Sequence, residues 1–139
     1  MKLVKLSSTK ESFNTIDFNQ KGLSIIIGTR NTSSTKNTYN GVGKSLALYL
    51  IQFCLGSKSN EKLKTKIPDW TFLLDFTIGN TKYQTERNTS TQSKIKLNSI
   101  EYTLDEFSKK MLTLAFDIPE DITKASFRSL ISRFLRTRK

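Results

Sequence analysis

Alternating polar and apolar residues near the amino terminus predict two short strands. The first is Lys2–Leu6 (KLVKL), and the second is Ser12–Phe18 (SFNTIDF), in which Phe13, Ile16 and Phe18 are apolar. A period of two places the apolar side chains of a strand on one face. Because few residues separate the two runs, we expect them to pair as a hairpin.

The next apolar run, Gly22–Gly28 (GLSIIIG), predicts a strand of a different kind. Three consecutive isoleucines between two glycines are typical of a strand that is buried on both faces. The following residues, Thr29–Asn37 (TRNTSSTKN), include no apolar side chain. They predict a polar loop inserted after the strand.

The segment Lys44–Leu55 (KSLALYLIQFCL) predicts a helix. It leaves almost no polar face, and a helix that is apolar all round is expected to be buried all round. Gly56 directly after it is expected to end the helix, because glycine tolerates the left-handed conformation at that position.

The second half of the chain predicts an antiparallel meander. A polar, lysine-rich connection, Ser57–Pro68, leads to it. Turn-forming pairs, Gly79-Asn80 and Asn98-Ser99, separate apolar runs, as in β-hairpins. The expected strands are Asp69–Ile78, 81–87, Lys94–Leu97 and Ile100–Tyr102.

Two helices are expected after the meander. Thr103 and Glu106 form a capping-box pattern that predicts a helix over Leu104–Phe116. Beyond Pro119, apolar residues in Ile122–Leu135 recur at helical spacing opposite several arginines. We therefore expect a basic terminal helix within 122–139, leading towards a coiled coil.

The charge of the chain changes this picture at one end. The 139 residues carry a formal charge of +11, and residues 124–139 hold six basic side chains and no acidic one. Such a tail attracts phosphates of nucleic acid, nucleotide or anionic lipid without geometric specificity. A solvated helix face is the alternative interpretation.

Length and composition bound the class of protein. The length fits a single domain, 1–139, or a fragment of a larger one. No apolar run is long enough to span a bilayer, and the amino terminus lacks the apolar region of a signal peptide. The single cysteine, Cys54, and the absence of histidine predict a reduced, cytoplasmic setting without a zinc site.

The candidate chemistry lies in Asn40–Ser45 (NGVGKS), between the predicted strand and the predicted buried helix. This is the context that a phosphate-binding loop requires. Glycines let the backbone N–H groups approach a phosphate, and the start of the helix adds unpaired donors. Lys44 would reach the β- and γ-phosphates, and Ser45 would bind Mg²⁺. The predicted nucleotide-binding residues are Asn40, Gly41, Val42, Gly43, Lys44, Ser45 and Leu46.

One position departs from the usual G-x-x-x-x-G-K-[ST] pattern. Thr38 stands where the first glycine is expected, and the polar insertion indicates that the chain enters the loop by another path. Thr38 and Tyr39 are further candidate nucleotide contacts, since the Tyr39 ring could stack on adenine. An ordinary glycine turn before a core helix is the alternative.

These residues resemble the head of SMC, RecF and RecN-type ABC ATPases, in which two amino-terminal strands and a strand ending in glycine precede N-G-x-G-K-S. Gly28 looks like the first glycine of that family pattern, displaced from Asn40 by the insertion. The insertion, the MKLVKL start and the closing FRSLISRFLR look closest to the YydD-like group of bacterial SMC-related ATPases. The resemblance also implies a basic side chain near the phosphates, which would be Lys10.

The resemblance implies an α/β fold: an ABC-type amino-terminal lobe with a mixed sheet around a buried helix, an antiparallel meander and carboxy-terminal helices. It further implies ATP and Mg²⁺ as cofactors, DNA as a partner in repair, recombination or defence, and pairing of two heads. This chain shows no L-S-G-G sequence and no apolar run followed by Asp-Glu. The Walker B and signature motifs are thus expected on a carboxy-terminal head lobe, downstream or in a partner chain. Alone, the lobe would not hydrolyse ATP.

Two other nucleotide-binding classes fit the sequence less well. No N-K-x-D sequence follows the loop, which argues against a GTPase, whereas arginines near the end (Arg128, Arg133, Arg136) leave open the lid of a nucleotide kinase. The main alternative is a non-enzymatic basic module with a vestigial loop, whose terminal helix binds nucleic acid.

Overall fold

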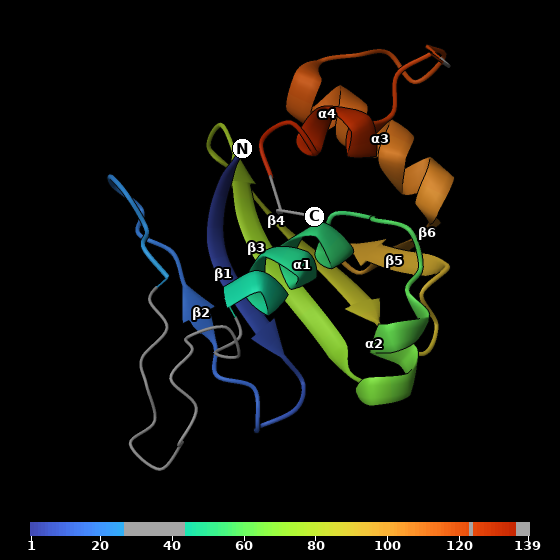
Figure 1. Cartoon of the computed structure of the whole chain (residues 1–139). Coiled ribbons are helices and arrows are strands. Elements are labelled where there is room, and N and C mark those ends of the chain that lie inside the picture. The colour runs from blue at the N-terminus through green and yellow to red at the C-terminus, as the bar shows by residue number, and fades with distance from the viewer. Residues whose placement is uncertain (27–43, 123, 136–139) are drawn as a thin grey trace.

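The computed structural model describes residues 1–26, 44–122 and 124–135 as a mixed α/β fold built on a six-stranded sheet (Figure 1). Neighbouring strands are antiparallel throughout, in the order β2-β1-β3-β4-β5-β6. The prediction of a mixed sheet is therefore wrong for the described residues. The strands are β1 (Lys2–Ser8), β2 (Ile16–Asp17), β3 (Thr71–Ile78), β4 (Thr81–Asn88), β5 (Lys94–Leu97) and β6 (Ile100–Thr103).

Local turn chemistry explains the meander. The structure confirms the strands that were predicted for it. Gly79 has a φ of +58° between β3 and β4, where a two-residue hairpin turn needs a positive φ. Asn98 and Ser99 have φ of 48° and 70° between β5 and β6, the pair of positive values that a type I′ turn requires. The expected hairpin of β1 and β2 is also present, but β2 is only two residues long.

Over the residues that the structure describes, four helices accompany the sheet: α1 (Lys44–Cys54), α2 (Glu61–Lys66), α3 (Leu104–Phe116) and α4 (Phe127–Ile131). Helix α1 crosses one face of the sheet, and α3 and α4 pack against each other near the carboxy-terminal end of α1 (Figure 1). Helix α2 was not anticipated in the polar connection Ser57–Pro68. It begins because the Asn60 side chain accepts a hydrogen bond of 2.7 Å from the backbone N–H of Lys62.

The core lies between the sheet and the helices. The inner face of the sheet supplies buried side chains from four strands, and α1 and α3 supply their facing residues. An edge contact between the rings of Phe53 on α1 and Phe72 on β3, with centroids 6.4 Å apart, joins the two layers. The inner-face residues are Leu6, Phe72, Leu74, Phe76, Thr85, Arg87, Ile95 and Leu97.

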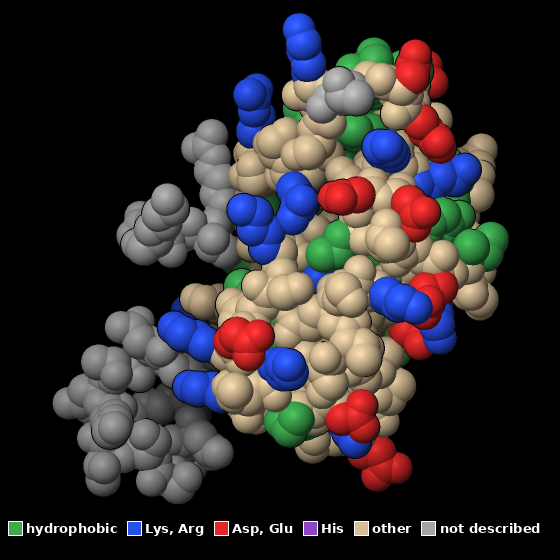
Figure 2. Space-filling view, turned by 90° about the vertical axis from the view of Figure 1, so that its right-hand side faces the viewer, with side chains coloured by type: hydrophobic (Ala, Val, Ile, Leu, Met, Phe, Trp, Pro, Cys, Tyr) green, Lys and Arg blue, Asp and Glu red, His purple; other side chains and the backbone are tan. Residues whose placement is uncertain are grey.

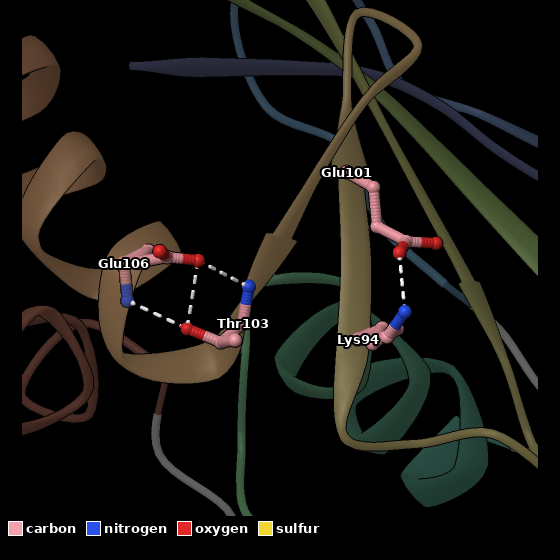
Figure 3. A network of polar contacts seen from close by, with 4 residues as sticks. All are labelled: Lys94, Glu101, Thr103 and Glu106. Carbon is pink, nitrogen blue, oxygen red and sulfur yellow. Dashed lines mark hydrogen bonds and ion pairs between the residues drawn. The ribbon is translucent and has the colours of Figure 1, made fainter.

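Ion pairs cross the other face of the sheet, which faces solvent as one face of an antiparallel sheet commonly does. Figure 3 shows one pair, and Figure 2 shows basic and acidic side chains interspersed over the side of the molecule that it presents. These pairs each join a basic and an acidic side chain on neighbouring strands, whose charges cancel. They are Lys5–Asp75 at 3.6 Å, Lys94–Glu101 at 2.6 Å and Lys96–Glu86 at 3.2 Å.

The strand expected over Gly22–Gly28 is not formed in its described part. Residues 22–26 belong to no strand, and the side chains of Leu23 and Ile25 are 75% and 69% exposed. The sheet ends at β2, so no strand within the described residues pairs with this segment. Its apolar side chains consequently have no second layer to pack against within the described parts of the chain.

The terminal helix expected over Ile122–Leu135 is also shorter than predicted. Helix α4 begins after Ser126, whose side chain accepts a hydrogen bond from the backbone N–H of Ser129. After Ile131 the chain continues as turns with i to i+3 bonds, such as Phe134 N–H to Ile131 O at 3.0 Å. The apolar residues that were expected on one helix therefore lie partly at the cap before α4 and partly in the turns after it. No helix within the described residues is long and apolar enough to cross a membrane.

Candidate functional site

The candidate site centres on the beginning of α1. The structure places Lys44, Ser45 and Leu46 in the first turn of this helix, and all three side chains are exposed. Asn40–Gly43, together with Thr38 and Tyr39, lies outside the described residues. The described half of the site therefore consists of a lysine and a hydroxyl at a helix amino terminus.

The electrostatics of this terminus favour an anion. The first N–H groups of an α-helix have no partner within the helix, and they carry the positive end of its dipole. The first turn of α1 contains no acidic residue that could neutralise this end, while Lys44 adds a full positive charge. This arrangement can bind a phosphate group.

The burial of α1 differs from the prediction of a helix covered on every side. Its amino-terminal turn is exposed, with Leu46 at 45%, whereas Leu50, Ile51 and Phe53 have almost no exposed surface. The helix rests on only one face of the sheet, so its outward face has no covering layer within the described residues. Packing contacts consequently concentrate in its second half.

The carboxy-terminal end of α1 is fixed by the predicted glycine. Gly56 has a φ of +83°, its N–H bonds Phe53 O at 3.2 Å, and Ser57 N–H bonds Gln52 O at 3.1 Å. These two bonds form a Schellman motif. A Cβ added to Gly56 would lie 2.9 Å from the ring of Phe107 on α3, so both the backbone conformation and the packing require glycine here.

A buried arginine also holds this end of the helix, and the sequence analysis did not identify it. Arg87 on β4 is 1% exposed. Its Nη1 donates to Phe53 O and Ser57 O at 2.8 Å each, and its Nε and Nη2 donate to Gln92 O at 3.0 and 2.6 Å. The guanidinium carbon also lies 4.3 Å from the centroid of the Phe53 ring.

Arg87 remains charged in this setting. Burial lowers the pKa of the guanidinium to about 10, which is still far above neutral pH. Burial likewise raises the pKa of the neighbouring Cys54 thiol to about 12, so this side chain is a neutral thiol. A cation is favourable against the last carbonyls of α1, and Arg87 adds a second donor to Phe53 O, which also accepts from Gly56 N–H.

The remaining candidate contact, Lys10, lies in the turn that follows β1. Its side chain is exposed, and its backbone bonds are local: its N–H donates to Ser8 Oγ at 3.2 Å, and its carbonyl accepts from Phe13 N–H at 3.1 Å. These contacts fix the turn without joining it to α1. The part of Lys10 in nucleotide binding stays a prediction.

Two polar hollows on the molecule offer no comparable chemistry. Both are lined in part by Lys94 and Glu101, whose charges are already paired at 2.6 Å (Figure 3). The Lys94 pKa is raised mainly by its hydrogen bond to Glu101. The start of α1 is therefore the stronger candidate site.

A comparison of the chain with models of known protein families and with curated proteins found no match. Within residues 1–26, 44–122 and 124–135, no three His, Cys, Asp or Glu side chains come together in a way that could hold a metal ion. The candidate Mg²⁺ ligand on the described part of the chain is thus the Ser45 hydroxyl named by the motif.

Proposed function

We propose that the chain binds Mg-ATP as the amino-terminal segment of an SMC-like ABC ATPase. The observation that carries this proposal is the formation of α1 directly after the sequence N-G-V-G, with Lys44 and Ser45 exposed in its first turn. In this position Lys44 binds the β- and γ-phosphates and Ser45 binds Mg²⁺. Backbone N–H groups at the helix start add donors to the phosphates.

The proposal includes a second head lobe. The apolar segment Leu23–Ile26 has a sequence typical of a central strand, yet two of its side chains are more than two-thirds exposed. The outward face of α1 carries the exposed Leu46 as well. A second lobe, downstream or in another chain, would cover both surfaces and supply the Walker B and signature motifs.

Hydrolysis then belongs to the completed head. Phosphoryl transfer needs a positioned water and additional charge stabilisation, and the motif residues of this chain provide phosphate and metal binding only. In this proposal two completed heads pair on ATP, and the assembly acts on DNA in repair, recombination or defence.

Nucleotide-dependent stability tests the proposal. ATP with Mg²⁺ at about 100 times its Kd is expected to stabilise the chain by about 2.7 kcal/mol and to raise the Tm by roughly 5–10 °C. Lys44→Ala should abolish this shift, because it removes the phosphate-binding charge. Thermal unfolding by circular dichroism, with and without Mg-ATP, measures both effects.

Lys82→Ala is the matched control, since Lys82 is an exposed lysine on β4. It should retain the full ATP shift. Equal ATP shifts in the wild type and in Lys44→Ala, or no shift at millimolar ATP, would contradict the proposal.

The basic charge of the chain favours a second candidate, a nucleic-acid-binding module that ignores nucleotide. Phosphate contacts make such binding strongly dependent on salt. DNA binding that weakens with salt, persists in Lys44→Ala and is unaffected by ATP would support this alternative. Fluorescence anisotropy with a labelled duplex, between 50 and about 200 mM salt, measures it.

A further inference from the structure

The helix that carries the candidate phosphate-binding residues is held to the sheet at its far end. Lys44 and Ser45 stand in the exposed first turn of α1, whereas Phe53 in the last turn is fully buried. Arg87 on β4 joins the two layers there, because its Nη1 donates hydrogen bonds of 2.8 Å to Phe53 O and Ser57 O. The 11 residues of α1 place this anchor about 16 Å from Lys44.

The Arg87 guanidinium is itself fixed from several directions. Its Nε and Nη2 donate to Gln92 O at 3.0 and 2.6 Å, and its central carbon lies 4.3 Å from the centroid of the Phe53 ring. The planar fork of an arginine can serve carbonyls on two sides at once, which the ammonium of a lysine cannot do with the same geometry. Arg87 therefore sets the distance between the end of α1 and the loop after β4, and not only the charge there.

Gln92 extends this network to the residues before α2. The Gln92 side chain is buried, its Oε1 accepts from Asn60 N–H at 2.6 Å, and its Nε2 donates to Asn60 O and Thr89 O at 2.9 and 2.7 Å. These bonds occupy both the donor and the acceptor of the amide. They hold in place the residue whose backbone carbonyl Arg87 binds.

The first turn of α1 depends on this anchor for its placement. Leu46 in that turn is 45% exposed, so it gains little packing against the described part of the chain. Phosphate binding needs the Lys44 ammonium and the first N–H groups of α1 to converge on one anion. A helix held in another direction would bring the same groups to the wrong place.

We propose that Arg87 is a positioning residue of the nucleotide site, which holds Lys44 and Ser45, through α1, where they bind the phosphates and Mg²⁺. The inference rests on the proposed function, because it concerns the same site. Arg87 does not itself touch the nucleotide, since it is 1% exposed and is bonded to the opposite end of the helix.

The Mg-ATP affinity of wild type and Arg87→Lys tests the proposal. Lysine keeps a basic group but cannot serve Phe53 O, Ser57 O and Gln92 O together. Arg87→Lys is expected to weaken Mg-ATP binding roughly tenfold, about the contribution of one charge-assisted hydrogen bond. Titration calorimetry, at a temperature where circular dichroism shows each protein fully folded, measures the dissociation constants. Equal constants would overturn the proposal.

Thr103→Ala is the matched control, because it removes the cap of α3 and destabilises the fold away from α1. It should leave the Mg-ATP affinity unchanged. A loss of affinity equal to that in Arg87→Lys would show a general effect of stability and overturn the proposal.

Gln92→Met is the second variant. It deletes the side-chain bonds to Asn60 and Thr89 but keeps the carbonyl that Arg87 binds, so it should weaken Mg-ATP binding less than Arg87→Lys does. If Arg87→Lys does not fold, Gln92→Met decides, and an affinity equal to that of wild type would overturn the proposal.

The position of α1 can also be measured without nucleotide. Spin labels on Leu46→Cys in the first turn and Lys82→Cys on β4 report the distance between the helix start and the sheet, and the buried Cys54 takes up no label. The distance distribution should shift or broaden in Arg87→Lys and stay that of wild type in Thr103→Ala. An unchanged distribution in Arg87→Lys would overturn the proposal.

The outcomes separate this inference from the proposed function. A wild type that binds no Mg-ATP would overturn the proposed function and the positioning role with it. A wild type that binds Mg-ATP, together with an Arg87→Lys variant that binds it equally well, would leave the proposed function intact and overturn the positioning role alone.

Discussion

Arg87 shows how one side chain can determine the position of a helix. It lies on the inner face of the sheet, where an unpaired charge is costly, and it contacts no carboxylate among its hydrogen-bond partners. Backbone carbonyls from three residues surround the guanidinium instead. The end of α1 and strand β4 are thereby held at a set distance.

Replacing Arg87 tests this role. Arg87→Met keeps most of the side-chain volume but removes the donors, so Gln92 O loses both of its bonds from Arg87, and Phe53 O keeps only its bond from Gly56 N–H. We expect the free energy of unfolding to fall by about 3 kcal/mol or more. Urea denaturation followed by circular dichroism measures the loss.

Arg133→Met is the control for this experiment, because Arg133 is exposed in the turn after α4. Its change in stability should stay within about 0.5 kcal/mol. If Arg87→Met lowered the free energy of unfolding by as little, the hydrogen bonds from Arg87 to the three carbonyls would not stabilise the fold.

Sequence reasoning at the residue scale succeeds where the interaction is local. Thr103 and Glu106 are three residues apart, so their pairing is visible as a pattern, and the structure confirms it. The Arg87 bond to Phe53 O joins residues 34 positions apart. Nothing in the neighbourhood of Arg87 in the sequence indicates that carbonyls will surround it.

The capping box of α3 gives a pH-dependent prediction at the scale of an element. The backbone N–H and hydroxyl of Thr103 donate to Glu106 Oε2 at 2.8 and 2.9 Å (Figure 3). These bonds favour the carboxylate, so the Glu106 pKa lies below its ordinary value of 4.5. The contribution of Glu106 is therefore complete above pH 4.5 and is lost as the pH falls through the lowered pKa.

Glu106→Gln separates this effect from general acid unfolding. Glutamine at this position can still accept a bond from Thr103, but it does not titrate. Wild type should thus lose more stability than the variant between pH 5 and pH 3, as measured by thermal unfolding at each pH. Parallel profiles for the two proteins would show that the carboxylate contributes nothing specific.

Removing the cap residue itself should act at every pH. Thr103→Ala deletes the acceptor for Glu106 N–H, which lies 3.3 Å away, and we expect a loss of about 1 kcal/mol. An unchanged free energy of unfolding in Thr103→Ala would contradict the capping role.

Elements set by adjacent turns were predicted well, and elements set by distant packing were not. Gly79-Asn80 and Asn98-Ser99 close hairpins with their own backbone conformations, so the strands beside them follow from local chemistry. The run Gly22–Gly28 has a strand-like composition, but a strand also needs a neighbour. For the described residues 22–26, that neighbour is not provided by the sheet.

The exposed segment also yields a prediction. Leu23→Thr with Ile25→Thr removes apolar side chains that pack little in this chain, so the Tm should change by less than about 2 °C. Exposed strand-like apolar segments promote association between chains. Light scattering at increasing protein concentration should accordingly show less self-association in the variant than in wild type.

A leucine-to-threonine substitution at a buried position gives the contrast. Leu74→Thr alone, on the inner face of β3 where Leu74 is fully buried, should destabilise the chain by about 2 kcal/mol or more. A large loss of stability in the Leu23 and Ile25 variant would mean that this segment packs more tightly than its exposure indicates.

At the scale of the whole molecule, the chain is a sheet with helices on one face. The sequence predicted the helix that begins at Lys44 and the meander, and both are present. It also predicted a sheet wrapped around a helix, and the structure instead shows α1 lying on one surface. Within the described residues no layer covers the outer side of α1, and the apolar pattern of a helix does not specify which residues would cover it.

The candidate site divides in the same way. The helix start at Lys44 was predicted, because the motif and the apolar run after it are contiguous, whereas the exposure of Lys44 and Ser45 was not. Residues 27–43, directly before Lys44, lie outside the described part of the chain, and the predicted contacts of Thr38 and Tyr39 stay predictions. The hydrogen bonds from Arg87 to carbonyls at the far end of α1 were not predicted, although they fix the helix that carries the motif.

The glycine turn and the Arg87 hydrogen bonds fix α1 at its carboxy-terminal end, near Gly56, so any tilt of the helix about that end would displace its first turn most. A tilt of about 10° around that point would move Lys44 by roughly 3 Å, given a helix about 16 Å long. A small change in the tilt of α1 near Gly56 would therefore displace Lys44 by several ångströms.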